Sequence, residues 1–252
     1  MKKFYVRGIR FLLCAFALAM IMTGTVLAKP AADEPKPKEE TAASALPLHE
    51  HSDACGNTTE EPVEIICILD RSGSMQNLSQ DTIGGYNSFV AQQREKEGSA
   101  TITTVLFDDK YEKIFDSVPL DEVPELTSKE YYARGTTALL DAVGKTIMST
   151  LGRMERDGVC PARRSVIVLI MTDGLENASR EYSREMVKRL IEETTKEYKW
   201  QFVFMGANID SVSEAQSIGI AASNAHDFDA SGDGVATSFE RMGEAVDRAR
   251  ER

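Results

Sequence analysis

The chain has 252 residues, of which 42% are hydrophobic, and this is ample for one domain of about 190 residues with a buried core. Its formal net charge is −11, and the first 28 residues contribute four positive charges and no acids, which leaves −15 on the remainder. This acidic balance excludes binding to nucleic acid, or to an anionic membrane surface, through bulk charge.

Residues 1–28 have the pattern of a secretory signal peptide. A basic start is followed by an apolar run over 11–22 and by small or modest residues up to Ala28, after which a signal peptidase would cut. Because the apolar stretch 11–28 is almost long enough to cross a bilayer, an uncleaved signal anchor is the alternative, and it would be the chain's only contact with a membrane. The expected location is secreted, or outside the cytoplasmic membrane at the cell surface.

Residues 29–62 are expected to form a linker. The segment combines proline with alternating charge and has few large apolar residues, so it cannot bury enough surface to offset the entropy cost of ordering. It should act as a semi-extended tether. The domain proper is therefore expected over 63–252.

From residue 63 onward strands and helices alternate, which predicts a mainly parallel sheet covered on both faces by helices. Strands are expected at 63–69, 101–107, 111–115, 165–171 and 201–205, with a weaker one near 218–223. Only the tripeptide 108–110 separates the second strand from the third, so these two form a hairpin and the third is an antiparallel edge strand. The expected fold is a doubly wound α/β sheet of about six strands.

Apolar residues recur at helical spacing in four further segments. These segments are 83–90, 139–154, 186–198 and 239–249. Gly158 is a stop signal for the second of them. Gly84 and Gly85 lie inside the first helix, where each costs about 1 kcal/mol relative to alanine. Close approach to a neighbouring element would explain them.

The most informative stretch follows the first apolar strand and reads Asp70-Arg71-Ser72-Gly73-Ser74. In an open α/β sheet, ligand sites form beyond the carboxyl ends of the strands. Asp70, Ser72 and Ser74 would therefore project from a tight turn into such a crevice. Their carboxylate and hydroxyl oxygens are hard ligands of the kind that Mg²⁺ and Ca²⁺ take.

These residues form the D-x-S-x-S signature of the von Willebrand factor type A (vWA) domain, and the chain resembles that family from about Glu61 to its end. The family's metal-ion-dependent adhesion site is completed by a threonine and an aspartate from two later loops. The resemblance points to Asp173, after the fourth predicted strand, and to one threonine of Gly135-Thr136-Thr137. Thr137 has the family's spacing to a following apolar residue and a small residue, whereas Thr136 does not. Either threonine could instead cap the next helix.

The resemblance implies a metal site, and no catalytic residues. Its expected ligands are Asp70, Ser72, Ser74, Thr137 and Asp173. Because only two of these carry charge, and some act through water in the family, the bound cation would keep affinity for an anion at an open position. The family fills that position with an aspartate or glutamate of a protein ligand, so we expect such a partner here. Octahedral oxygen coordination suits Mg²⁺ best, with Mn²⁺ or Ca²⁺ as alternatives.

Residues beside the three loops are candidates for contacting a partner, although solvated surface positions are the simpler interpretation. They are Arg71, Gln76, Arg134, Glu176, Asn177 and Asn208. The resemblance also implies that the first and fourth strands are parallel neighbours, which would bring Cys55 and Cys160 to one edge and allow a disulfide between them. Cys67, inside the first strand, is expected to pack as a small hydrophobe.

Two other metal patterns are weaker. Residues 229–240 match an EF-hand loop at positions 1, 3, 5, 6 and 12, but a strand and loop are expected before them where an EF-hand has a helix. Ser231 is therefore interpreted as part of the cap of the last helix. His49, His51 and Cys55 could hold zinc or copper, but only as three ligands in a tether.

Catalysis is the main rival class of function. The domain proper contains one histidine, His226, and the chain has neither a G-x-S-x-G elbow nor a phosphate-binding G-x-x-x-x-G-K. We therefore expect a metal-dependent adhesion or protein-binding module that is not an enzyme. The alternatives are a scaffold whose metal only stabilises the fold and, more remotely, a metal-dependent hydrolase. The signal and the resemblance of 70–86 and 204–210 to one subgroup indicate a bacterial protein. That subgroup is often cytoplasmic, so no partner is carried over from it.

Overall fold

Six strands form a single sheet in the computed structural model of the protein, which describes residues 62–251. Their order is β3-β2-β1-β4-β5-β6. The strands are β1 (Val63–Asp70), β2 (Ala100–Phe107), β3 (Tyr111–Pro119), β4 (Val166–Thr172), β5 (Gln201–Gly206) and β6 (Ala225–Asp227). All neighbouring pairs are parallel except β2 and β3, so β3 is an antiparallel edge strand. The predicted fold class is confirmed.

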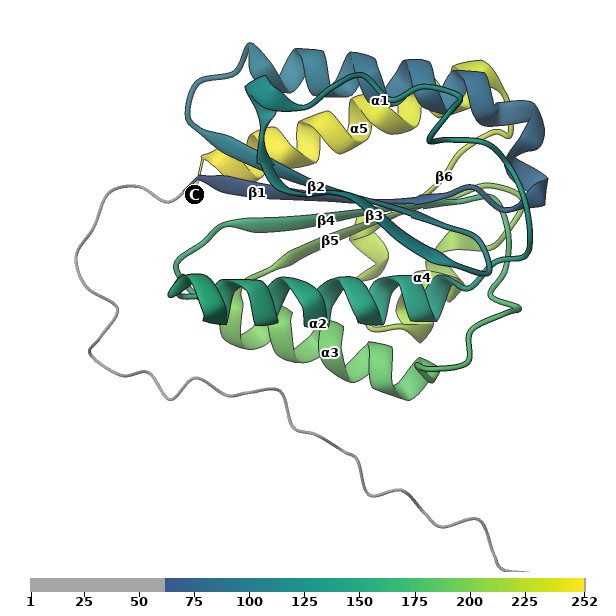
Figure 1. Ribbon diagram of the computed structural model, residues 1–252. Coiled ribbons are helices and arrows are strands. Elements are labelled where there is room, and N and C mark those ends of the chain that lie inside the picture. Colours follow the sequence, from purple (N-terminus) through teal and green to yellow (C-terminus); the bar gives the residue numbers. More distant parts are fainter. Residues whose placement is uncertain (1–61, 252) are drawn as a thin grey trace, which may run out of the picture. The chain divides into compact units, whose positions relative to one another are not determined.

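Helices cover both faces of this sheet (Figure 1). In the described part of the chain they are α1 (Ser79–Arg94), α2 (Leu139–Asp157), α3 (Arg184–Tyr198), α4 (Ser211–Ser217) and α5 (Gly232–Arg250). Figure 1 shows α1 and α5 on one face and α2 and α3 on the other. Three short 3₁₀ helices lie between these elements, at Gly73–Leu78, Leu120–Glu122 and Ala222–Asn224.

Strand β1 supplies side chains to the hydrophobic cores on both faces. Because successive residues of a strand point to opposite sides, Ile65 and Leu69 pack toward α1 and α5, whereas Ile66 and Ile68 pack toward α2 and α3. Cys67 is fully buried, and this burial raises the pKa of its thiol. It therefore packs as a small hydrophobe, as predicted. Burial on both faces explains why β1 reads as a continuous apolar run.

The prediction of a weak strand near 218–223 is wrong. Ile218 and Ile220 are buried in the core on the α2 side, and Gly219 between them has a φ of +91°. The apolar alternation thus comes from a turn that follows α4 and inserts into the core. The sixth strand is β6, which pairs with β5 over Ala225–Asp227. Strand β3 also runs beyond its predicted end at 115, to Pro119.

The segment 229–240 begins a helix and is not an EF-hand. Ser231 is the N-cap of α5, and its Oγ accepts a hydrogen bond from the Gly234 N–H at 3.2 Å. Glu240, which would be the last calcium ligand of an EF-hand, lies well inside α5. The short strand β6, and not a helix, precedes the segment. The interpretation of Ser231 as a cap is confirmed.

Several predictions fall outside the described residues. They concern the signal peptide at 1–28, the linker at 29–62 except for its last residue, and the possible metal ligands His49, His51 and Cys55.

The proposed disulfide joins Cys160 to Cys55, which is outside the described residues. Strands β1 and β4 are parallel neighbours, as the resemblance implied, and the thiol of Cys160 is free in the structure. Within residues 62–251, none of the helices combines the length and the apolar character that crossing a bilayer requires.

The two adjacent glycines of α1 have different surroundings. A Cβ at Gly85 would lie 2.4 Å from the ring of Phe239 on α5, whereas at Gly84 it would meet nothing within 4 Å. We expect Gly85→Ala to lower the free energy of unfolding by about 1–3 kcal/mol through overpacking. Gly84→Ala should raise it by up to about 1 kcal/mol, because alanine is the better helix former. Urea denaturation measures both, and equal effects would contradict the close approach at Gly85.

Candidate metal centre

Three loops meet at the carboxyl end of the sheet, and four of the predicted ligands contact one another there. Asp70 ends β1 and Asp173 follows the neighbouring strand β4. The Ser72 N–H donates to Asp70 Oδ1 at 2.6 Å, and the hydroxyls of Ser72 and Ser74 lie 3.0 Å apart. Ser74 Oγ donates in turn to Asp173 Oδ1 at 2.5 Å. The D-x-S-x-S turn thus reaches across to the loop that follows β4.

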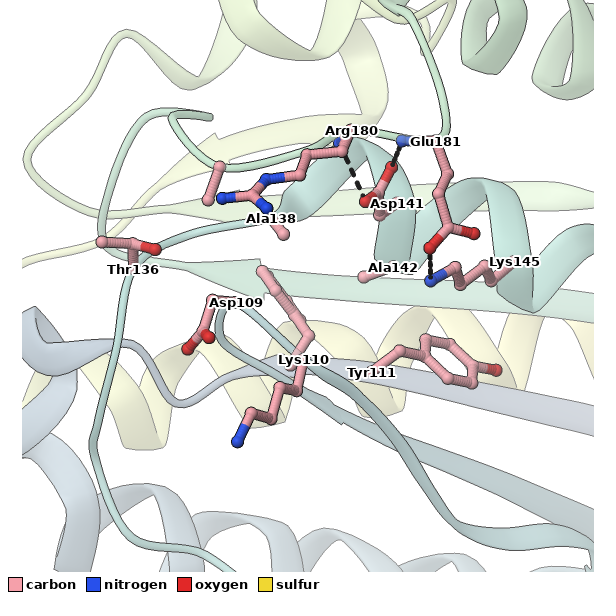
Figure 2. Close-up of a pocket in the computed structure, with 12 residues that line it drawn as sticks. Asp109, Lys110, Tyr111, Thr136, Ala138, Asp141, Ala142, Lys145, Arg180 and Glu181 are labelled. Atoms are coloured by element: carbon pink, nitrogen blue, oxygen red, sulfur yellow. Dashed lines mark hydrogen bonds and ion pairs between the residues drawn. The ribbon is translucent and has the colours of Figure 1, made fainter.

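The structure distinguishes between the two candidate threonines. A methyl group on Gly174 would lie 3.6 Å from Thr137 Oγ1 and 3.8 Å from Ser74 Oγ, so both hydroxyls face the turn after Asp173. Thr137 is buried, whereas Thr136 is exposed. Thr136 lines a separate polar pocket of about 210 Å³, formed with the β2–β3 turn and the start of α2 (Figure 2). The five predicted ligands therefore lie together, and Thr136 lies outside the group.

The loop after β4 also holds the threonine loop in place. Asn177 Oδ1 accepts from the Thr137 N–H at 2.9 Å, and the Asn177 N–H donates to the Thr137 carbonyl at 3.0 Å. Glu176 accepts from the Leu140 N–H at 2.9 Å, where its negative charge also suits the N-terminus of α2. Glu176 and Asn177 are thus braces between two loops, a role that the interpretation as solvated or partner-contacting residues missed.

Arg71 is fully buried, so its interpretation as a partner contact or a solvated residue is wrong. Its side chain reaches the β2–β3 turn, where its Nε lies 2.9 Å from Asp108 Oδ2. Its Nη2 lies 2.6 Å from Glu112, and Asp108 Oδ2 also accepts from Arg134 Nε at 2.7 Å. Gln76, another candidate partner contact, is exposed. Asn208, the last of the candidate partner contacts, is exposed too.

Asp108 joins the loop after β1 to the threonine loop. The sequence analysis did not single it out. Burial raises its pKa, but hydrogen bonds from Arg134, the Lys110 N–H and Arg71 outweigh this and hold the pKa below its usual range. Its backbone carbonyl also accepts from the Ala138 N–H at 2.9 Å, next to the threonine loop. Nothing in the chain distinguishes Asp108 from the exposed Asp109 beside it.

The two acidic candidates are buried without a positive partner. Burial raises the pKa of Asp70 to about 6, although hydrogen bonds from Thr172 and Ser72 oppose the shift. Burial likewise raises the pKa of Asp173. Within residues 62–251 neither carboxylate forms an ion pair. Two desolvated carboxylates beside three hydroxyls form an all-oxygen donor set that fits a hard divalent cation.

No protein-family model and no curated protein matches the chain. Solved structures do match. One is proximal thread matrix protein 1 from the mussel byssus with a zinc-occupied MIDAS motif, at 14% identity over 76% of this chain and 49% of that one, with a TM-score of 0.54. The chain has a von Willebrand factor type A fold.

Two further matches have lower TM-scores. A second crystal form of the mussel protein is 18% identical over 73% of this chain and 45% of that one, with a TM-score of 0.49. The ArnB paralog VWA2 from Sulfolobus acidocaldarius is 16% identical over 71% of this chain and 44% of that one, with a TM-score of 0.48. The chain thus spans about half the length of the structures that it matches.

The raised pKa of Asp70 makes the stability of the domain depend on pH in the absence of metal. Because the folded state holds the proton more tightly than the unfolded state, the contribution of Asp70 is present at low pH and is lost as the pH rises through about 6. In EDTA we expect this contribution to be about 1 kcal/mol larger at pH 5 than at pH 7. Urea denaturation of the wild type and of Asp70→Asn at both pH values measures it. An identical pH dependence of the two proteins would contradict it.

Proposed function

We propose that this domain binds a divalent cation and, through it, an acidic side chain of a protein partner. The ligands are Asp70, Ser72, Ser74, Thr137 and Asp173. The observation that supports this most strongly is the burial of two carboxylates, with raised pKa values and without ion-pair partners in the described part of the chain. A divalent cation supplies the missing positive charge, and the three hydroxyls supply neutral donors around it.

The donor set favours Mg²⁺, with Mn²⁺ or Ca²⁺ as alternatives. All five side chains offer oxygen, which hard cations prefer, and none offers the nitrogen or sulfur that zinc sites commonly use. Two carboxylates balance the charge of the cation only when both are ionised and close to it. Hydroxyl and water ligands leave the cation able to attract a further anion, which is the role assigned to the partner's aspartate or glutamate.

We place this activity outside the cytoplasmic membrane of a bacterium, because residues 1–28 have the pattern of a signal peptide and 29–62 that of a tether. The module would then act in adhesion or protein binding, and not as an enzyme. A scaffold whose metal only stabilises the fold is the competing function. Metal-dependent stability without metal-dependent capture of acidic proteins or peptides would favour that scaffold.

The neighbouring threonines provide a matched test of the site. Thr137→Val removes a hydroxyl that, like that of Ser74, faces the turn after Asp173, so we expect it to weaken Mg²⁺ binding at least tenfold, or about 1.4 kcal/mol. Thr136→Val makes the same chemical change on the exposed side of the loop and should leave the affinity unchanged. Isothermal titration calorimetry with Mg²⁺ measures both. Equal affinities for the two variants, or no Mg²⁺ binding by the wild type, would overturn the proposed site.

A further inference from the structure

The exposed large apolar side chains of the described residues gather at one edge of the sheet. They are Tyr132 (44% exposed), Leu175 (58%), Met186 (43%) and Val212 (36%). Tyr132 precedes the threonine loop and Leu175 comes two residues after Asp173. Met186 and Val212 lie in the first turns of α3 and α4, which begin at the carboxyl edge of the sheet. Single exposed apolar residues are ordinary, but these share the edge that carries the proposed cation site.

The ring of Tyr132 is held in a fixed position although almost half of it is exposed. The guanidinium of Arg71 lies 5.6 Å from the ring centroid and that of Arg134 lies 5.0 Å from it. Arg134 Nη1 also donates to the Tyr132 hydroxyl at 2.6 Å. Arg71 is itself buried and paired with Asp108. An aromatic ring held in this way loses little conformational entropy when a partner packs on it.

Leu175 is the most exposed of the four, and the residues on both sides of it are anchored. The Gly174 carbonyl accepts from Thr172 Oγ1 at 3.1 Å, and Glu176 accepts from the backbone N–H of Ser179 at 2.7 Å. The next residue, Asn177, is joined to Thr137 by two hydrogen bonds. The loop therefore presents an apolar side chain outward from a braced backbone, directly beside the proposed ligands.

We propose that Tyr132 and Leu175 form an apolar rim around the cation, and that this rim selects partners in which a large apolar residue lies close to the acid. The inference rests on the proposed function and adds the chemistry of the partner to it. An acid bound to the cation brings the residues next to it over the loops that carry the rim. Burial of aromatic and aliphatic anchors at the centre of an interface then contributes affinity, while the cation selects the acid.

A library of random peptides displayed on phage tests this on the intact domain. Selection in Mg²⁺, compared with selection in EDTA, should enrich aspartate or glutamate together with a large apolar residue at a constant offset. Replacing that apolar residue by alanine in one synthetic selected peptide should weaken its binding to the wild type at least tenfold. With Leu175→Ser the same replacement should cost less than threefold, because its contact is already missing.

Two further variants separate the rim from general effects. Tyr132→Ser should reduce the apolar preference in the same way as Leu175→Ser, and neither variant should change Mg²⁺ affinity, because neither residue is a proposed ligand. Met186→Ser removes a similarly exposed apolar side chain from α3 and should leave the peptide preference intact. Enrichment of acids without an apolar neighbour would overturn the rim and leave the proposed function standing. No Mg²⁺-dependent enrichment of acids would overturn the proposed function itself.

Discussion

Replacing Asp70 by asparagine is expected to abolish the stabilisation of the domain by Mg²⁺. The substitution keeps the shape of the side chain but removes one of the two charges that the cation would neutralise. At a Mg²⁺ concentration one hundred times the dissociation constant, the wild type should gain about 2.7 kcal/mol of unfolding free energy relative to EDTA. A variant that binds at least one hundred times more weakly should gain no more than about 0.4 kcal/mol at that concentration. Urea denaturation with and without Mg²⁺ measures both.

Asp109→Asn is the matched control for this experiment. It removes the same charge from an exposed aspartate beside the threonine loop, where the side chain lines the polar pocket of Figure 2. Its response to Mg²⁺ should equal that of the wild type. The proposed site would be wrong if Asp70→Asn kept the full Mg²⁺ effect, or if Asp109→Asn lost it as well. Mg²⁺-dependent capture of acidic peptides should disappear in Asp70→Asn alone.

Asp108→Ala should cost about 3–5 kcal/mol of unfolding free energy, which makes it the most destabilising substitution that we expect. Asp108 and Arg71 are both fully buried, and removal of the carboxylate leaves Arg71 with the partly exposed Glu112 as its remaining ion-pair partner and the Glu130 carbonyl as a neutral acceptor. The pKa of Asp108 lies below its usual range because its charged form is hydrogen-bonded, so the group that is lost is the ionised one. Urea denaturation in EDTA measures the effect on the fold apart from any metal.

An exposed ion pair provides the comparison for Asp108. Asp247 lies 2.7 Å from Lys96, and the two side chains are 36% and 46% exposed. Asp247→Ala should therefore cost no more than about 1 kcal/mol. An equally small loss of unfolding free energy in Asp108→Ala would show that Asp108 does not hold the loop after β1 and the threonine loop together. If the protein stays folded, Asp108→Ala should also weaken Mg²⁺ binding, because Arg71 and Arg134 lose the group that holds their loops together.

Much of the architecture could be predicted because it follows from local patterns. The apolar runs that became β1 and β4 are buried on both faces, and the hairpin follows from the three residues between β2 and β3. The prediction failed near residue 220, where Ile218 and Ile220 alternate like a strand although Gly219 turns the chain. The spacing of apolar residues indicates which side chains are buried. A buried turn and a buried strand can have the same spacing, so the pattern alone does not distinguish them.

Asp70, Ser72 and Ser74 could be chosen from the sequence because they come at, and just after, the end of an apolar strand. Thr137 and Asp173 were chosen because the chain resembles the vWA family. Asp70 and Asp173 lie at the carboxyl ends of the parallel neighbours β1 and β4, so this strand order brings them to the same edge of the sheet. The burial of Arg71 depended on Asp108, 37 residues away, and the brace between Thr137 and Asn177 spans 40 residues. The sequence pattern and the resemblance thus supplied the proposed donors and the edge of the sheet on which they meet. The tertiary structure alone decided which charged neighbours are buried as supports, because the burial of a charge depends on partners that only folding brings within hydrogen-bond distance.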